Sequence, residues 1–316
     1  LHADINAIDA DSVVYASNFG LWSAGGYRWP LITWSMGGTV VFHQNDDLDR
    51  PLREHAMTHV FATPSLLSEL LGKLPEDFQR TDAMRLMVTA GAMPSALVAL
   101  ARQRLTRQVY SVLASTEALT IAVTPLEDEQ DLHWHRIHPA RNVQVVDEAH
   151  HPLPPGSVGH VRIYVLDGLQ GYLHDEAATA MCFRDGWFYP GDMGVLAEDG
   201  RLCLHGRMAD VVNILGTKMA TGKMERLFQD RLGASTVCVL MLLAGEGDEE
   251  LHVVVETRGS LGREQCEAAL SSELRALAGM HVHFDLIDAM PRNAMGKVLR
   301  QELGRRLLED RARQVP

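Results

Sequence analysis

The first third of the chain alternates short apolar runs with helical patterns, and this alternation limits the possible folds more than any other feature. The runs GTVVFH (Gly38–His43) and THVFA (Thr58–Ala62) predict buried strands, and a third apolar run ends at Thr89. Between them, Thr63 and Pro64 form the typical start of a helix, followed by a leucine stripe. Strands that alternate with helices at this spacing predict an α/β fold with a mostly parallel sheet.

The pattern changes twice further along the chain. From about residue 131 to residue 207, short strands are separated by proline and glycine turns, which predicts a β-rich part with little helix. From residue 208 to residue 316, a strand, an amphipathic helix, a hairpin, a helix and a last strand predict a small α+β domain. We therefore expect a partial large domain over 1–207, its α/β part covering about 1–130, and a small C-terminal domain over 208–316.

Composition excludes several classes of protein. With 46% hydrophobic and 22% charged residues, the chain has an ordinary globular composition. No apolar run approaches the roughly 20 residues of a membrane helix, and the first residues lack a signal-peptide pattern. The net charge of -12, without a basic block, argues against nucleic acid as a partner. The four cysteines show no CxxC spacing, so we expect reduced thiols and a cytoplasmic location, and from the lack of a long apolar run we expect no membrane partner.

Two loops that follow predicted strands contain residues suited to a phosphate-bearing ligand. TAGAMP places Gly91 and Ala92 where open α/β sheets bind ligands, although a tight turn that needs glycine is the alternative. In LASTEAL, the hydroxyl of Thr116 and the carboxylate of Glu117 follow an apolar strand. Such a pair can hold phosphate oxygens and Mg²⁺, which favours one or two carboxylates together with substrate phosphates. An exposed turn without a ligand is the alternative reading of Thr116 and Glu117.

A third candidate loop lies in DGWFYPGDMGVLAEDGRLCLHGR. Asp192 stands between Gly191 and Gly194, and Arg207 follows at the end of the next predicted strand. A carboxylate can accept hydrogen bonds from both hydroxyls of a ribose, and an arginine could hold the same sugar or a neighbouring phosphate. The alternative is a solvated hairpin with a surface ion pair.

The fourth candidate is Lys297, which follows Gly296 in PRNAMGKVLRQEL, just before a helical pattern. A lysine is cationic at neutral pH, and its ammonium group suits phosphate and carboxylate oxygens. Its expected role is therefore to stabilise developing negative charge and not to act as a base. Taken alone, Lys297 could equally be an exposed surface residue.

In their order and spacing, these motifs resemble the adenylate-forming superfamily of acyl- and aryl-CoA synthetases, nonribosomal peptide adenylation domains and luciferases. TAGAMP resembles the family's GGAPL loop, and LASTEAL its YGSTE motif. The segment from GYLHDEAAT to GTKM resembles the family's ribose motif, and PRNAMGKVLRQEL its terminal lysine motif. The resemblance runs from about Tyr15 to Leu303, and it implies a large N-terminal domain followed by a mobile C-terminal lid.

The resemblance implies catalytic and nucleotide-binding roles. Thr116 would contact phosphate, Glu117 would help to hold Mg²⁺, and Asp192 with Arg207 would bind the ribose. Lys297 would bridge the carboxylate of the acid and the α-phosphate while the acyl-adenylate forms. The other positions on the nucleotide side would be Gly91, Ala92, Leu113, Ala114 and Ser115.

The resemblance also implies a substrate pocket and a hinge. SNFGLWSAGGYRWPLITWSMGG resembles the segment that begins the acyl pocket, with Asn18, Phe19 and Trp22 as wall candidates, although the two aromatic residues could equally be core. Ala209 and Asp210 would form the hinge. Gly216 and Lys218 would lie on the loop that replaces Lys297 at the site when the small domain rotates for thioester formation.

Several positions depart from the family pattern. No run like the phosphate loop SGTTG.PKG occurs in the chain, so we expect an N-terminally truncated chain with little adenylation activity of its own. Leu113 replaces an aromatic residue that stacks on adenine, and leucine offers no ring face. Ala114 replaces a glycine, Pro190 a threonine or serine, and Ala209 the first aspartate of the hinge pair.

The resemblance therefore implies an ATP-dependent ligase that uses Mg²⁺. It would activate an aryl or medium-chain carboxylic acid and pass the acyl group to CoA or to a phosphopantetheine carrier protein. A non-catalytic or crippled adenylate-binding homologue is the alternative, because of the missing phosphate loop, Leu113 and Ala209.

Overall fold

The chain forms two compact units in a computed structural model, Leu1–Leu204 and His205–Pro316. The structure describes all residues except 17–18, 21–22, 44–48, 92, 166–168, 170, 208–210, 215–216, 234–235, 244–248, 258–261, 270–281, 294–296 and 315–316. For residues 207, 211–214, 217–220, 223, 243, 249, 269 and 311–314, it describes the backbone alone. The expected division at residues 207 and 208, with a lid that moves, stays a prediction.

The first unit contains a largely parallel sheet with the strand order β2-β1-β3-β4-β5-β6, in which β6 alone among these runs antiparallel to its neighbour. Its strands are β1 Val13–Ala16, β2 Thr39–Val41, β3 His59–Ala62, β4 Arg85–Thr89, β5 Val109–Ser115 and β6 Leu119–Pro125. The helices are α1 His2–Asn6, α2 Ala24–Ser35, α3 Arg50–Glu54, α4 Pro64–Lys73 and α5 Ser95–Arg104. The predicted α/β class is therefore confirmed.

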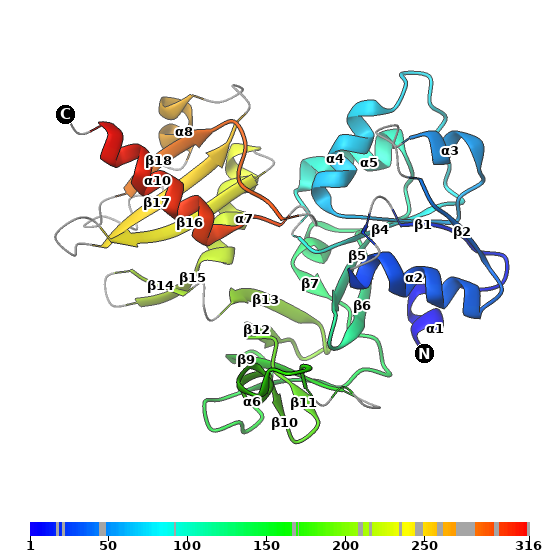
Figure 1. Cartoon of the computed structure of the whole chain (residues 1–316), viewed down its shortest axis with the longest axis horizontal. Helices are drawn as coiled ribbons and strands as arrows, with labels where there is room; N and C mark the ends of the chain where they lie inside the picture. The colour runs from blue at the N-terminus through cyan, green and yellow to red at the C-terminus, as the bar shows by residue number, and fades with distance from the viewer. Residues whose placement is uncertain are drawn as a thin grey trace. The chain divides into compact units, whose positions relative to one another are not determined.

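Helices cover both faces of this sheet (Figure 1). On one face, α4 and α5 pack their apolar side chains against residues of β1, β3 and β4, including Val60 and Leu86. On the other face, Trp29 of α2 stacks on Phe61 of β3, with ring centroids 3.9 Å apart. Such burial between two helical layers explains why β3 is apolar at successive positions without alternation.

The local signals of α4 are confirmed, and the reading of β2 is wrong in one respect. Thr63 caps α4, because its hydroxyl accepts a hydrogen bond from the backbone N–H of Leu66 at 3.2 Å.

The segment GTVVFH, which was predicted to be a buried strand, is the half-exposed edge strand β2. An edge strand has a neighbour on one side only, so its apolar residues need not be fully covered.

The second sheet of this unit is antiparallel in its recorded pairings, with the strand order β10-β11-β9-β12-β13-β7, and β8 also pairs with β9. It supplies the short strands expected from the proline and glycine turns. Its elements are η1 Glu129–Leu132, β7 Trp134–His135, β8 Val143–Val146, β9 Val158–Tyr164, α6 Glu176–Cys182, β10 Phe183–Arg184, β11 Trp187–Phe188, β12 Asp192–Leu196 and β13 Leu202–Arg207.

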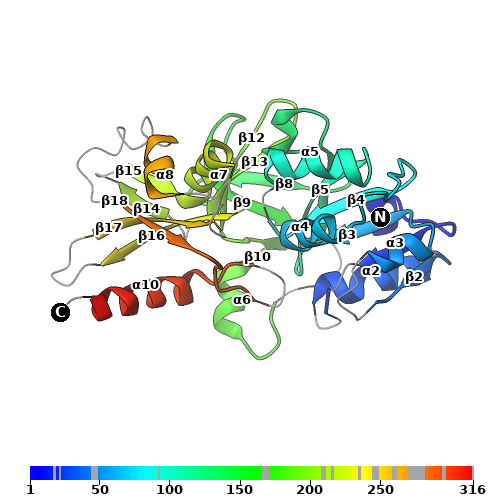
Figure 2. The same cartoon turned by 90° about the horizontal axis from the view of Figure 1, so that it is seen from above.

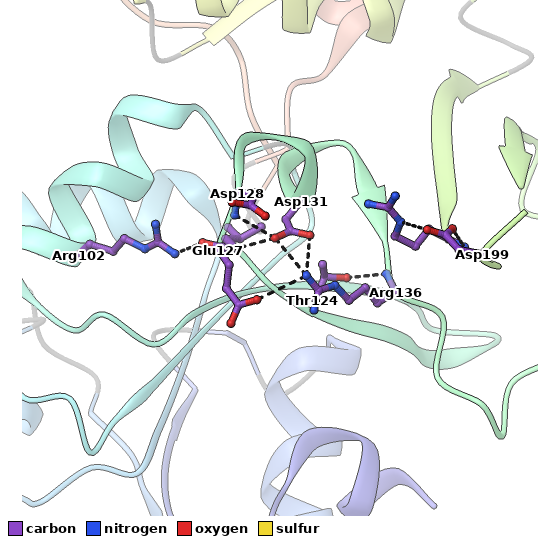
Figure 3. A network of polar contacts seen from close by, with 9 residues as sticks. Arg102, Thr124, Glu127, Asp128, Asp131, Arg136 and Asp199 are labelled. Carbon is purple, nitrogen blue, oxygen red and sulfur yellow. Dashed lines mark hydrogen bonds and ion pairs between the residues drawn. The ribbon is translucent and has the colours of Figure 1, made fainter. Parts of the chain in front are cut away.

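A buried carboxylate fixes the connection between the two sheets (Figure 3). The Asp131 side chain is 2% exposed and accepts hydrogen bonds from the backbone N–H groups of Glu127 and Asp128 and from Arg136 at 3.0 Å. Burial alone would raise the pKa of Asp131, but these donors together hold it below its ordinary value. The anchored connection leads directly into β7, which pairs with β13.

The second unit packs helices on both faces of the sheet β16-β17-β18 (Figure 2). Met224 and Phe228 of α7 and Cys266 of α8 cover one face, and Leu303 and Leu307 of α10 cover the other. The predicted hairpin is the antiparallel pair β16 and β17. The elements are β14 Val211–Ile214, β15 Thr217–Ala220, α7 Thr221–Leu232, β16 Thr236–Leu243, β17 Glu249–Glu256, α8 Arg263–Ala269, β18 Val282–Ile287 and α10 Arg300–Gln314. None of the described helices is long and apolar enough to cross a membrane.

Candidate functional site

One cleft in the first unit brings together residues that the sequence placed in two separate motifs. Leu113, Ala114 and Ser115 at the end of β5 line it from the parallel sheet, and Asp192 at the start of β12 lines it from the antiparallel sheet. The sequence did not indicate the apolar part of the lining, because these side chains meet only in the folded unit. That part consists of Ile121, Val161, Ile163, Leu202 and Leu204, with Pro190 beside Asp192.

The two glycines around Asp192 each have a structural reason. Gly191 has a φ of +78°, a left-handed conformation that favours glycine. A Cβ at Gly194 would lie 2.8 Å from the carbonyl oxygen of Cys203 and 2.9 Å from Val161. The first glycine thus turns the chain into β12, and the second lets β12 pack closely, so that Asp192 is held at the mouth of the cleft.

A tight turn between β5 and β6 presents Thr116 and Glu117. The hydroxyl of Ser115 accepts a hydrogen bond from the backbone N–H of Ala118 at 2.9 Å and closes the turn. The β5–β6 register shifts between Leu113 and Ala114, an irregularity of the kind that re-aims side chains next to functional sites. Thr116 is exposed and Glu117 is half-buried, so both remain accessible from this turn.

Tyr172, for which no role was predicted, contacts Glu117. The Tyr172 hydroxyl donates a hydrogen bond to Glu117 Oε1 at 2.7 Å, across a separation of 55 residues. Burial, and then the bond to Glu117, raise the pKa of Tyr172, so the phenol stays protonated and donates. The backbone N–H of Tyr172 is in turn held by the hydroxyl of Thr179 at 2.8 Å. Tyr172 therefore holds one carboxylate oxygen of Glu117 in place.

If Glu117 binds Mg²⁺ as expected from the sequence, replacing Tyr172 with phenylalanine should raise the Mg²⁺ concentration needed for half-maximal activity by about 10-fold, because the carboxylate loses its hydrogen-bonded support. A Mg²⁺ titration of acid-dependent pyrophosphate exchange, in a protein that includes this chain and a phosphate loop, checks this. Tyr189→Phe is the matched control, since the Tyr189 hydroxyl bonds to Arg162 and not to Glu117. An unchanged Mg²⁺ requirement in Tyr172→Phe would show that the contact does not support a metal site.

In the loop TAGAMP, the residue that turns the chain is not the expected one. Ala90, and not Gly91, has the left-handed φ, at +66°. A Cβ on Gly91 would lie 3.2 Å from Cγ of Pro64, so glycine is favoured there by the close approach of α4. Ala92 lies outside the described residues.

Of the three candidates for the wall of the acyl pocket, the structure describes Phe19. Its side chain is 7% exposed and packs edge-on against Trp29 at 5.5 Å between ring centroids. This packing agrees with the core alternative, and a wall role for Phe19 stays a prediction. Asn18 and Trp22 lie outside the described residues.

In the second unit, Lys297 is exposed and its backbone is held at the base of a loop. Its N–H donates to Asn293 Oδ1 at 3.0 Å, and its carbonyl accepts from the N–H of Asn293 at 2.9 Å. Arg292, which forms an isolated β-bridge with Val298, bonds to Glu256 at 2.8 Å. The residue expected to carry the reacting charge thus has a backbone that is anchored on both its N–H and its carbonyl.

Replacing Arg292 with methionine should destabilise the second unit by about 2 kcal/mol, because Glu256 is left buried without its cation. Hydrogen exchange of the β17 amides measures this opening free energy. The control is Arg305→Met, whose guanidinium pairs with Glu302 on the surface and should change stability little. Equal effects of the two substitutions would contradict the anchoring role.

The remaining candidates can be placed only in part. Arg207 ends β13 and Lys218 lies in β15, and the structure describes their backbones alone. Ala209, Asp210 and Gly216 lie outside the described residues. Their roles stay predictions.

A second hollow lies at the opposite end of the β12–β13 hairpin, and its charges are already compensated. It is lined by Arg136, Asp199 and Arg201 among others. Arg136 bonds to Asp131, and Arg201 bonds to Asp199 at 2.7 Å (Figure 3). Because both arginines are already paired with carboxylates, this hollow is a weak candidate for binding an anionic ligand.

Comparison with known proteins identifies the family. The model of the AMP-binding enzyme family matches residues 4–173, which is more than half of the chain. The chain is 28% identical over 262 residues to a medium-chain fatty-acid–CoA ligase of Escherichia coli, covering 79% of the chain and 46% of the relative. It is 28% identical over 181 residues to the fatty acid–[acyl-carrier-protein] ligase ScoC of Streptomyces coeruleorubidus, covering 56% of the chain and 34% of the relative.

Among solved structures, ATP-bound MatB from Rhodopseudomonas palustris matches with a TM-score of 0.82 and 20% identity, over 96% of this chain and 62% of that chain. The chain belongs to the AMP-binding enzyme family, and the expected relationship to the adenylate-forming superfamily is confirmed. It spans about half the length of the curated relatives that it matches, or less.

Proposed function

We propose that the protein activates a carboxylic acid with ATP, forming an acyl-adenylate, and then transfers the acyl group to a thiol. The observation that carries this proposal is the single cleft that joins Leu113, Ala114 and Ser115 to Asp192. The cleft has a volume of about 30 Å³, so it must widen to admit an adenosine, whose flat base suits apolar walls and whose ribose offers two hydroxyl donors to Asp192. Asp192 would accept both hydroxyls, and Leu113 would pack against the base.

The β5–β6 turn suits the phosphates of the same nucleotide. Thr116 offers an exposed hydroxyl, and Glu117 offers the carboxylate oxygen that Tyr172 does not occupy. This donor set fits Mg²⁺, which prefers one or two carboxylates together with substrate phosphates. Bound there by Glu117, the ion would offset phosphate charge.

In the first half-reaction, a carboxylate oxygen of the acid attacks the α-phosphorus, and the bond to the pyrophosphate oxygen breaks. Lys297 would place its ammonium group between the acid and the α-phosphate and stabilise the added negative charge in the transition state. Lys297 lies in the second unit, so we propose that this unit acts as a lid. In the second half-reaction, a thiol attacks the acyl carbon and AMP leaves. Lys218 and Gly216 would then replace Lys297 at the site.

Relatives support a thiol acceptor without choosing between CoA and a carrier protein. One relative is named as a CoA ligase and another as an acyl-carrier-protein ligase. Both are named for fatty acids, which agrees with the medium-chain acyl candidate, and the aryl candidate remains open. We propose either phosphopantetheine thiol as the acceptor.

The test is ATP–pyrophosphate exchange with a panel of aryl and medium-chain acids, on a protein that includes this chain and a phosphate-loop segment. Exchange that depends on the acid is the expected result. This chain by itself should bind AMP but exchange pyrophosphate weakly, because no SGTTG-like run occurs in its sequence. Nucleotide binding by the longer protein without exchange for any acid would instead support the alternative, a non-catalytic adenylate-binding homologue.

A further inference from the structure

Two arginines are buried behind the turn that presents Thr116 and Glu117. Arg28 of α2 is 7% exposed, and Arg141, between β7 and β8, is 8% exposed. Arg28 donates to the backbone carbonyl of Ser115 at 3.3 Å, and Arg141 donates to that of Ala118 at 2.6 Å. The two guanidinium groups therefore contact the two ends of the same short turn.

Neither guanidinium forms an ion pair with any carboxylate in the described part of the chain. Their Nε–H groups are buried and make no hydrogen bond to described residues. Burial lowers the pKa of Arg28 to about 10 and also lowers the pKa of Arg141. A buried charge that lacks a counter-charge destabilises a fold, so such groups mark sites where a ligand supplies the missing charge.

His2 adds a third basic group to these two arginines. Its pKa is lowered first by burial, and then by the positive charges of Arg141 and Arg28. Its Nδ1 is buried and has no hydrogen-bond partner among the described residues. Arg28 and Arg141 thus form a cationic cluster, which His2 joins as a neutral imidazole, and each of the three side chains has one buried nitrogen without a hydrogen-bond partner among the described residues.

The place of the cluster indicates which ligand it would take. Ser115, which accepts from Arg28, also lines the proposed nucleotide cleft and directly precedes Thr116. Arg28 itself lies in α2, within the segment SNFGLWSAGGYRWPLITWSMGG, which follows β1. An acid that presents one carboxylate to the phosphates at Thr116 would therefore have its remaining part near Arg28.

We propose that this cationic cluster binds a second carboxylate of the acid substrate, so that the enzyme selects dicarboxylic acids over monocarboxylic acids. Arg28 is the specificity-determining residue, because guanidinium and carboxylate match in shape as well as in charge. Arg141 contributes further positive charge. This inference rests on the proposed function, since it names the class of acid that the same site takes.

A purely structural role for Arg28 would be to clamp the turn through Ser115. The two roles predict opposite effects on stability. Removing a clamp lowers the melting temperature, whereas removing a buried charge without a counter-charge leaves it unchanged or raises it. Arg104 is the matched control, because it bonds to the backbone carbonyls of Leu74 and Pro75 at 3.0 Å and 2.7 Å and lies away from this turn.

The experiment measures acid binding to this chain by calorimetry in the absence of ATP. Adipate and isophthalate are each compared with their monomethyl esters, which keep the size of the acid and lose one charge. The dicarboxylates should bind at least about 10-fold more tightly than the esters, and Arg28→Met should remove this preference. Arg28→Lys should retain part of it, and Arg104→Met should retain all of it.

Melting temperatures without ligand complete the test. Arg28→Met should melt no lower than the parent chain, and Arg104→Met should melt lower. The proposal is overturned if Arg28→Met melts as low as Arg104→Met, if the parent chain shows no preference for the dicarboxylates, or if inorganic phosphate competes as strongly as they do. Because the binding assay contains no ATP, its result does not depend on whether the protein catalyses adenylation. ATP–pyrophosphate exchange that occurs with monocarboxylic acids and not with dicarboxylic acids would support the proposed function and overturn this inference.

Discussion

Replacing Lys297 with alanine should lower acid-dependent pyrophosphate exchange by about 100-fold or more in a protein that includes this chain and a phosphate loop. The reason is that the ammonium group interacts with charge that develops mainly in the transition state. Loss of such an interaction lowers the rate of the chemical step and changes substrate binding less. The measurement is kcat and KM for exchange, and the decrease should appear in kcat.

The control for Lys297 is Lys73→Ala, which removes another exposed lysine at the end of α4. Lys73 pairs with Glu69 at 2.7 Å in the first unit, so its removal should leave exchange unchanged. The loop that carries Lys297 is held through Asn293 and Arg292, so the alanine variant should keep its backbone position. Exchange close to the parent value in Lys297→Ala would refute the proposed role of this lysine.

Replacing Asp192 with alanine should weaken AMP binding to this chain by about 100-fold, since two hydrogen bonds from ribose hydroxyls to a carboxylate are lost. The bonds are expected to be strong because the acceptor is charged. Isothermal titration with AMP gives the affinity directly. Asp192→Asn should lie between alanine and the parent, because the amide retains one acceptor oxygen.

The matched control for Asp192 is Asp199→Ala on the same hairpin. Asp199 lies at the turn between β12 and β13, where it pairs with Arg201 on the surface. Its removal should leave AMP binding unchanged. Equal AMP affinity in the two alanine variants would mean that the cleft at Asp192 is not the nucleotide site.

Elements of the fold with strong local signals could be predicted from the sequence. The Thr63 cap and the leucine stripe define α4, and the apolar run of β3 defines a strand between two helical layers. The position of Asp192 could also be predicted, because Gly191 marks a turn of the chain directly before it. In each case the signal lies within a few residues of the feature that it predicts.

Features that depend on distant contacts could not be predicted in this way. Tyr172 meets Glu117 only because the antiparallel sheet brings a loop back to the β5–β6 turn. Arg28 and Arg141 are charged residues that a sequence places at the surface by default, and their burial is known only from the fold. The left-handed Ala90 was missed because the adjacent Gly91 is the usual residue for that conformation.

The most direct test of acid activation follows the oxygen atoms of the acid. A protein that includes this chain and a phosphate loop is given ATP, a thiol acceptor and an acid labelled with oxygen-18 in its carboxylate. Attack of the carboxylate on the α-phosphorus, followed by thiol attack on the acyl carbon, leaves one carboxylate oxygen on AMP. Mass spectrometry should therefore find one oxygen-18 atom in AMP and none in pyrophosphate. Unlabelled AMP, or label in inorganic phosphate together with ADP, would contradict the proposed adenylation.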